Sequence, residues 1–271
     1  MIPAVAKPVD QIKIFIDGQA ILAHAITRKL IENHNIDASN ILVNTYEKLD
    51  SLPFIKWMDK QGIRWFKSDY RSSATIQTIT EFNPDYIMSA YGLRILPNAV
   101  LNLANILSFN MHPSYLPDYK GRWIPSWAII NGEQEHGITF HVMAEEIDVG
   151  DILYQTKIAI SIDDTAYSLY YKLLCEFVTE FDGFFNQLLT GNISASPMAT
   201  GGRYFNKTIP FNGIIDPTWD LDFTEKFIRG MFFPPHTRAK LKINDSYYEC
   251  TTIQDYMQLQ NKLSNSLTRP K

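Results

Sequence analysis

The sequence has little of what defines several large classes of protein. Its 271 residues include two cysteines, Cys175 and Cys250, which excludes a framework of several disulfides. Lysine and arginine number 25 against 29 aspartates and glutamates, and this balance disfavours a non-specific nucleic-acid binder. Near the start, Asp10, Lys13 and Asp17 interrupt any apolar core of a signal peptide. We therefore expect a cytoplasmic protein without nucleic-acid partners.

Long apolar runs and nucleotide-binding glycine motifs are missing as well. The longest stretch without a charged residue, 95–117, contains several prolines and asparagines, so we expect no membrane span and no membrane partner. The first predicted strand is followed by residues 17–20, DGQA, with a single glycine. The G-x-G-x-x-G and P-loop motifs are absent, which disfavours the usual NAD and ATP chemistry.

What the sequence does contain is a regular alternation of apolar runs and helical patterns. Hydrophobic residues make up 45% of the chain and aromatic residues 13%, which is enough to build a large core. Strands are predicted at 12–16, 40–43, 65–66, 85–88 and 106–111, and helices at 20–31, 54–58, 74–82 and 100–104. This βαβαβ order predicts the α/β class, with a doubly wound, mostly parallel sheet.

The second half of the sequence no longer shows the regular alternation of short strands and helices. A strand is predicted at 152–161 and one long amphipathic helix at 166–189. A passage rich in glycine, serine and proline then spans 191–202 and indicates a domain boundary. We therefore predict a catalytic domain at 1–195 and a C-terminal segment at 196–271.

The C-terminal segment is predicted to form a small β-rich appendage. Residues 240–252 alternate as a hairpin would, with Asn244, Asp245 and Ser246 at the turn and Tyr247 and Tyr248 beyond it. An aromatic hairpin is a suitable dimer contact, so we expect a homodimer.

The residues that carry chemistry cluster near the end of the strand predicted at 106–111. Asn110 and His112 are two apart, so both side chains lie on one face of the strand. Pro113 forces the chain out of the strand. Asp148 lies in a glycine-containing turn, from which it could fold back to orient the imidazole, as in a catalytic triad.

An asparagine, a histidine and an aspartate without a nearby serine or cysteine nucleophile point to direct group transfer. The amide and a protonated imidazole can stabilise an oxyanion while a neutral imidazole or a carboxylate takes a proton, which suits acyl transfer to an amine. Each residue also has a plain structural explanation: Asn110 as a turn residue, His112 as a satisfied structural histidine, and Asp148 as a loop cap.

A longer run of motifs surrounds these residues. Segments 110–121, 127–133, 137–141 and 148–151 read NMHPSYLPDYKG, WAIINGE, GITFH and DVGD, and residues 89–96 read SAYGLRIL. This pattern resembles the 10-formyltetrahydrofolate-dependent formyltransferases, a family that includes glycinamide ribonucleotide, methionyl-tRNA and sugar-nucleotide N-formyltransferases.

The resemblance implies an enzyme with a formyltransferase fold, 10-formyltetrahydrofolate as formyl donor, and no metal. It assigns the catalytic roles to Asn110, His112 and Asp148. The pterin of the folate is expected against backbone groups of two loops, and the residues predicted to bind it are Tyr91, Leu93, Arg94, Ile95, Leu96, Glu146 and Asp148.

The acceptor is indicated by the C-terminal segment. Residues 203–207, 213–216, 227–229 and 232–235 read RYFNK, GIID, FIR and FFPP, and they resemble the sugar-nucleotide N-formyltransferases. A methionyl-tRNA formyltransferase is the alternative enzyme. It needs a sizeable basic domain, whereas residues 203–271 hold ten Lys/Arg against seven Asp/Glu, a net of +3. A scaffold protein that keeps the fold without catalysis is the alternative class.

Cationic and aromatic side chains in these segments are suited to a nucleotide, because aromatic faces stack on bases and cations pair with diphosphate. The residues predicted to bind substrate are Lys120, Arg122, Trp123, Arg203, Tyr204, Lys207 and Phe233. They could equally form a packed turn and a solvated surface. By family likeness alone, the expected acceptor is dTDP-4-amino-4,6-dideoxyglucose, and the resemblance implies a role in making O-antigen sugars of lipopolysaccharide.

Overall fold

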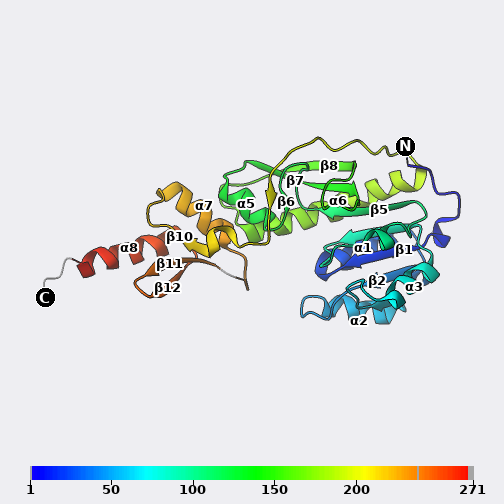
Figure 1. The fold of residues 1–271 in the computed structure, drawn as a ribbon, viewed down its shortest axis with the longest axis horizontal. Helices are drawn as coiled ribbons and strands as arrows, with labels where there is room; N and C mark the ends of the chain where they lie inside the picture. Colours follow the sequence, from blue (N-terminus) through cyan, green and yellow to red (C-terminus); the bar gives the residue numbers. More distant parts are fainter. Residues whose placement is uncertain (1, 237, 268–271) are drawn as a thin grey trace. The chain divides into compact units, whose positions relative to one another are not determined.

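A computed structural model describes residues 2–236 and 238–267, and Figure 1 shows its fold with many of the helices and strands labelled. Within these residues, seven strands form one sheet in the order β3-β2-β1-β4-β5-β7-β8. Their bounds are Ile14–Gly18 (β1), Ile41–Asn44 (β2), Arg64–Phe66 (β3), Tyr86–Ala90 (β4), Leu107–His112 (β5), Glu135–Val142 (β7) and Ile152–Ala159 (β8). Strands β1 to β5 pair in parallel and β7 pairs antiparallel with β5, which confirms the α/β fold class with its mostly parallel sheet.

The helices follow the predicted order in the first half of the chain. Their bounds are Ala20–Glu32 (α1), Leu52–Gln61 (α2), Ser73–Phe82 (α3), Asn98–Leu101 (α4), Ile124–Ile130 (α5), Ala166–Thr190 (α6), Leu221–Met231 (α7) and Ile253–Leu267 (α8). Helices α5, α7 and α8 are not among the helices predicted from the sequence. A capping signal was available for α7, because the side chain of Asp220 accepts a hydrogen bond from Phe223 N at 2.7 Å.

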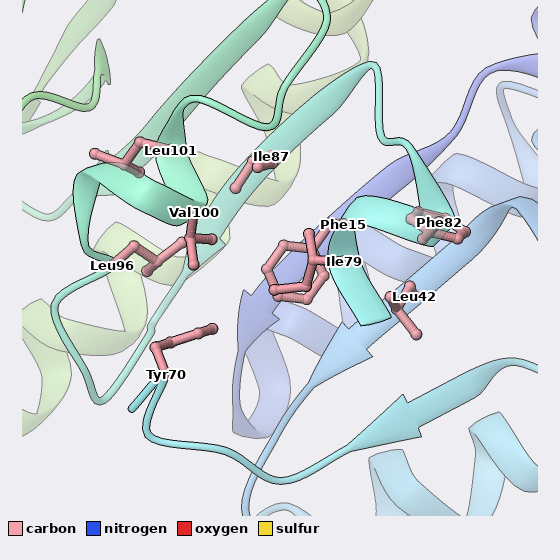
Figure 2. Packing of buried hydrophobic residues seen from close by; sticks show 9 residues of the cluster. All are labelled: Phe15, Leu42, Tyr70, Ile79, Phe82, Ile87, Leu96, Val100 and Leu101. Atoms are coloured by element: carbon pink, nitrogen blue, oxygen red, sulfur yellow. The ribbon is translucent and has the colours of Figure 1, made fainter. Parts of the chain in front are cut away.

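One face of the sheet is covered by α3 and α4 (Figure 2). Phe15 of β1 pairs in register with Leu42 of β2 and Ile87 of β4, so the three side chains form an apolar row across neighbouring strands. Ile79 and Val100 pack against this row from the two helices. At 25 cal/mol per Å² of buried apolar surface, each such side chain contributes roughly 2 kcal/mol.

The opposite face is covered by aromatic residues of α6. Phe184 stacks on Phe140 of β7 with ring centroids 4.1 Å apart and also contacts Phe109 of β5 at 5.4 Å. Phe185 contacts Tyr86 of β4 at 5.9 Å. The long apolar stripe of α6 therefore anchors the centre of the sheet, which fixes the strands that carry the site.

Among the described residues outside this sheet, there are two smaller sheets. Strands Ile214–Ile215 (β10), Ala239–Ile243 (β11) and Ser246–Cys250 (β12) form a three-stranded sheet, and the antiparallel β11–β12 pair confirms the predicted hairpin. Strands Lys120–Gly121 (β6) and Tyr204–Phe205 (β9) form a two-stranded parallel sheet. Phe227 of α7 and Leu241 of β11 are fully buried in the core of this part.

The chain divides into two compact units that interleave along the sequence. Unit 1 comprises Met1–Pro117, Ile138–Thr156 and Leu174–Gly201, and unit 2 comprises Asp118–Gly137, Lys157–Leu173 and Gly202–Lys271. The predicted catalytic and folate-binding residues all belong to unit 1. The predicted acceptor-binding residues all belong to unit 2.

Candidate active site

Strand register aligns five polar residues across the sheet. Asn44 of β2 pairs with Asp17 of β1, Asp17 with Ser89 of β4, Ser89 with Asn110 of β5, and Asn110 with His141 of β7. We call these five residues the polar row. Paired residues of neighbouring strands share a face, so the row lies one step beyond the apolar row, towards the carboxyl ends of the parallel strands. This edge is where open α/β sheets bind ligands.

The imidazole of His112 is oriented by Asp148. His112 is the last residue of β5, and Asp148 lies in the loop after β7 with the left-handed backbone conformation φ 56°. His112 Nδ1 lies 3.3 Å from Asp148 Oδ1, and both side chains are buried. A carboxylate beside Nδ1 favours a proton on that nitrogen, which leaves Nε2 as the atom that can exchange a proton with a substrate.

His141 fixes the amide of Asn110. His141 Nδ1 lies 2.9 Å from the Val142 carbonyl oxygen, which can only accept, so Nδ1 carries the proton. Burial lowers the pKa of His141 to about 4, with His112 adding to the shift, so the ring is neutral at physiological pH. Nε2 is then an acceptor, and Asn110 Nδ2 lies 3.1 Å from it. The side-chain amide donates one N–H to His141 and keeps the other for a substrate.

Thr139 holds the chain that follows His112. Its Oγ1 donates to Ser114 O at 2.6 Å and accepts from Leu116 N at 3.1 Å. Gln155 of β8 donates to both Thr139 Oγ1 (2.8 Å) and Leu116 O (2.7 Å). These four hydrogen bonds hold the loop that follows β5.

The predicted pterin loop follows β4 on the same edge of the sheet. Tyr91 has φ 63°, and Ile95 is 66% exposed, whereas the Leu96 side chain is buried in the cluster of Figure 2. Among the described residues, the backbone groups of Leu93 and Ile95 make no hydrogen bond within the chain. They can therefore bond a bound heterocycle. Leu96 can contribute only through its backbone.

The other predicted folate residues differ in their surroundings. The Arg94 guanidinium lies 5.8 Å from the centre of the Tyr46 ring, and Glu146 is exposed in the loop that carries Asp148. Backbone contacts to a folate, as expected for these two loops, are compatible with this arrangement.

Asp17 is a buried carboxyl at the end of β1. Its Oδ1 accepts from Tyr70 Oη at 2.5 Å and from Asn44 Nδ2 at 2.9 Å, while Oδ2 has no partner among the described residues. Desolvation raises the pKa of Asp17 to about 6, against the two hydrogen bonds. A Cβ on Gly92 would lie 2.1 Å from Oδ2, so only glycine fits there. The carboxyl therefore sets the path of the pterin loop at Gly92.

The predicted acceptor residues come together in unit 2, with one exception. Strand β6 pairs with β9, Arg122 N donates to Phe205 O at 2.8 Å, and Trp123 Nε1 donates to Lys207 O at 3.1 Å. We call residues 120–123 and 203–207 the acceptor ribbon, and it holds six of the seven predicted residues. The exception is Phe233, whose ring contacts Tyr170 at 5.2 Å and His236 at 5.7 Å.

Arg203 of the acceptor ribbon is engaged by two carboxylates. Its Nε lies 3.0 Å from both oxygens of Asp118, and its Nη2 bonds Asp118 and lies 2.8 Å from Glu133 Oε1. Its role as a diphosphate ligand stays a prediction. To bind a diphosphate, the guanidinium would have to leave these two carboxylates.

The described part of the chain lacks both a membrane-spanning helix and a metal-binding cluster. No helix there has the length and apolar character needed to cross a bilayer. Residues 2–236 and 238–267 also contain no group of three His, Cys, Asp or Glu side chains arranged to hold a metal ion.

Comparison with known proteins identifies the family to which this chain belongs. The formyl transferase family matches residues 11–176, which is more than half of the chain. GDP-perosamine N-formyltransferase of Brucella melitensis biotype 1 is 37% identical over 178 residues, which cover 66% of this chain and 68% of that protein. The chain belongs to the formyl transferase family, on its sugar-nucleotide N-formyltransferase branch. The predicted enzyme class, an N-formyltransferase, is thereby confirmed.

Solved structures show the same fold. A sugar N-formyltransferase from Shewanella sp. matches with a TM-score of 0.71 at 19% identity, covering 89% of this chain and 98% of that one. An N-formyltransferase from Helicobacter canadensis, in complex with folinic acid and dTDP-3-aminofucose, matches with a TM-score of 0.67 at 23% identity, covering 89% and 87%.

His141, Thr139 and Asp17 are not among the site residues predicted from the sequence. Thr139 and His141 are two apart in a strand, so their spacing already places them on one face. Nothing in the sequence indicates that β7 pairs with β5, and that pairing makes His141 the neighbour of Asn110.

Proposed function

We propose that the protein transfers the formyl group of 10-formyltetrahydrofolate to the amine of a nucleotide-linked aminosugar. The observation that carries the proposal is the geometry around β5, where Asp148 holds the imidazole of His112 and neutral His141 holds the amide of Asn110. The pair offers a proton-exchanging Nε2 and an N–H donor on one strand, which is what acyl transfer to an amine needs.

The mechanism we propose is direct attack. The uncharged sugar amine forms a bond to the formyl carbon, and the carbonyl oxygen takes the negative charge. Asn110 donates its second N–H to that oxygen, and His112 donates to it from Nε2 once that nitrogen has taken a proton from the attacking amine. The proton leaves the attacking nitrogen and reaches the departing folate nitrogen through His112 or Asp148 as the carbon–nitrogen bond to folate breaks. The N-formylated aminosugar nucleotide and tetrahydrofolate are the products.

Folate binding is proposed for the two loops that flank the catalytic residues. The support is the exposed loop after β4, whose Leu93 and Ile95 backbone groups are unpaired among the described residues, and the loop between β7 and β8 that contains Asp148. Folinic acid in the Helicobacter canadensis protein, which shares the fold, is consistent with this assignment.

The acceptor is proposed at the coarser level of a nucleotide-linked aminosugar, bound by unit 2 residues. Family likeness favours dTDP-4-amino-4,6-dideoxyglucose in our sequence analysis. The similarity to the Brucella melitensis enzyme supports GDP-perosamine as the competing acceptor. Four further expectations from the sequence remain proposals: the homodimer, the domain boundary at 195/196, the cytoplasmic location and the O-antigen role.

A turnover assay tests this function. Wild-type protein is incubated with 10-formyltetrahydrofolate, and release of tetrahydrofolate is followed with dTDP-, UDP- and GDP-linked aminosugars and with initiator methionyl-tRNA. We expect turnover with one aminosugar nucleotide. Turnover with tRNA alone would establish the tRNA formyltransferase alternative, and no turnover with any acceptor would contradict the proposal.

A further inference from the structure

The acceptor ribbon is too short to hold itself together. Strands β6 and β9 contain two residues each and pair only through Lys120 with Tyr204 and Gly121 with Phe205. Even longer two-stranded pairs are marginally stable in water. Trp123 adds one side-chain bond to Lys207 O. Other contacts must therefore fix the position of the ribbon.

Arg203 supplies those contacts at the start of β9. Its backbone N–H donates to Asp118 Oδ1 at 2.8 Å, and its carbonyl accepts from Lys120 N at 2.9 Å. Its guanidinium bonds both oxygens of Asp118 and one oxygen of Glu133. One residue thus joins the segment before β6, the segment after α5 and the start of β9.

Tyr119 closes the same network. Its hydroxyl donates to Glu133 Oε1 at 2.7 Å and accepts from Asn131 Nδ2 at 3.0 Å. The Arg203 guanidinium carbon lies 4.2 Å from the centre of the Tyr119 ring, and Phe205 stacks on that ring at 5.2 Å. Planar guanidinium groups suit both bidentate pairing and ring stacking, whereas lysine suits neither. The residue type therefore matches a fixed structural role.

The charges around Arg203 argue against a diphosphate at this position. Hydrogen bonds from Arg203 lower the pKa of Asp118, so this carboxylate remains ionised at neutral pH. Glu133 is a second carboxylate beside the same guanidinium, so two acidic side chains surround one cation. A nucleoside diphosphate placed here would meet net repulsion, and its binding would leave both carboxylates without their partner.

Two other cations of the ribbon, unlike Arg203, are not paired with carboxylates of the described residues. Arg122 and Lys207 are exposed, and among the described residues they form no ion pair. The ring of Tyr204 between them in the sequence is 61% exposed. Cations and an open aromatic face on one short ribbon are complementary to a diphosphate and a base.

We propose that Arg203 is a positioning residue that, through Asp118, Glu133 and Tyr119, holds the acceptor ribbon in place, and that Arg122 and Lys207 contact the diphosphate of the acceptor. This inference rests on the proposed function for the identity of the ligand. The cations predicted together as substrate ligands thus divide into two roles: Arg203 holds the ribbon, and Arg122 and Lys207 bind the diphosphate.

Two carboxylate variants distinguish a positioning role from a ligand role. The dissociation constants of GDP and dTDP are measured for wild type, Arg203→Gln, Asp118→Asn and Glu133→Gln. If Arg203 positions the ribbon, each variant weakens binding by about tenfold, because each breaks the same network. It also raises the KM for the aminosugar nucleotide and leaves the KM for 10-formyltetrahydrofolate unchanged. If Arg203 is itself the ligand, Asp118→Asn and Glu133→Gln free it and bind as tightly as wild type or more tightly, which would overturn the proposal.

Matched variants complete the test. Arg122→Gln and Lys207→Gln should weaken nucleotide binding and flatten its salt dependence, and unchanged binding in both would overturn their assignment. Arg28→Gln removes an exposed arginine that pairs with Glu32 elsewhere in the chain, and it should change nothing.

Hydrogen exchange keeps the positioning role testable without a ligand. The amides of Lys120 and Arg122 bond to Arg203 O and Phe205 O. Arg203→Gln should therefore speed their exchange, while amides of the β4–β5 pair stay protected. Unchanged exchange in residues 118–123 would overturn the positioning role. If wild type binds neither nucleotide but the exchange result holds, the proposed acceptor fails and the positioning role stands.

Discussion

Asn110 and His141 face each other across the antiparallel pair of β5 and β7, with Asn110 Nδ2 3.1 Å from His141 Nε2. Because His141 donates its Nδ1 proton to Val142 O and stays neutral, it can only accept from Asn110. The amide is therefore held in one orientation before any substrate binds. Preorganised donors of this kind require no rearrangement as charge develops, which is where their catalytic benefit comes from.

The first prediction concerns the imidazole and its carboxylate. His112→Ala or Asp148→Asn should reduce turnover by about 10³-fold or more, because each removes the group that moves the proton or its orienting partner. Binding of the nucleotide sugar should survive, since its predicted ligands lie in unit 2. Single-turnover rates and nucleotide dissociation constants measure the two effects, and near-normal turnover in either variant would contradict the assignment.

His141 gives the second prediction. His141→Phe keeps a buried ring but removes the acceptor, so the amide of Asn110 is free to turn, and kcat should fall by about 10- to 100-fold with little change in KM. His141→Gln offers an amide oxygen in place of Nε2 and should recover part of the loss. Steady-state kinetics for both variants test this, and equal activity of the Phe and Gln variants would refute the orienting role.

The third prediction is a pH dependence of stability with two opposing parts. Burial raises the pKa of Asp17 from 3.8 to about 6, so its folded form holds a proton that the unfolded chain has lost between these pH values. Its contribution to stability is full below pH 3.8 and falls by about 3 kcal/mol as pH rises to 6.

His141 behaves in the opposite way. Its pKa falls from 6.5 to about 4, so the unfolded chain binds the extra proton, and stability rises by about 3 kcal/mol between pH 4 and 6.5. Urea unfolding across this range should show Asp17→Asn gaining stability relative to wild type as pH rises, and His141→Gln losing it. Differences that do not vary with pH would contradict both shifts.

The fourth prediction concerns the pterin loop. Gly92→Ala would place a Cβ 2.1 Å from Asp17 Oδ2 and 2.9 Å from Ser89 Oγ, so the loop must shift. We expect the KM for 10-formyltetrahydrofolate to rise by about tenfold, while the KM for the aminosugar nucleotide is unchanged.

A second glycine provides the control for this variant. Gly183 lies within α6, and a Cβ there meets nothing within 4 Å. Gly183→Ala should leave both KM values unchanged and stabilise the helix by about 0.5–1 kcal/mol. If Gly92→Ala leaves the folate KM at the wild-type value, the loop does not bind the pterin.

The sequence by itself determines most of the sheet. Strands β1, β2, β4 and β5 and helices α1, α3 and α6 follow from apolar runs and helical spacing, because these elements are buried continuously or on one stripe. The hairpin of β11 and β12 follows from its alternation and turn residues. Local sequence patterns predict an element when its buried side chains recur with the period of that strand or helix.

The family resemblance is also a property of the sequence. It carries the prediction of an N-formyltransferase, which the family comparison confirms, and it singles out Asn110, His112 and Asp148. The spacing of Asn110 and His112 places them on one face, but it leaves the partner of each side chain undecided.

Only the tertiary structure decides those partners. The register of β7 against β5 makes His141 the neighbour of Asn110, and the ribbon of β6 and β9 joins Arg203 to Asp118 across 85 residues of sequence. Strand neighbours and ion pairs are set by long-range packing, which no local periodicity encodes. The sequence therefore identifies which residues can do the chemistry. The fold decides which of these side chains are fixed in place and which neighbouring residues fix them.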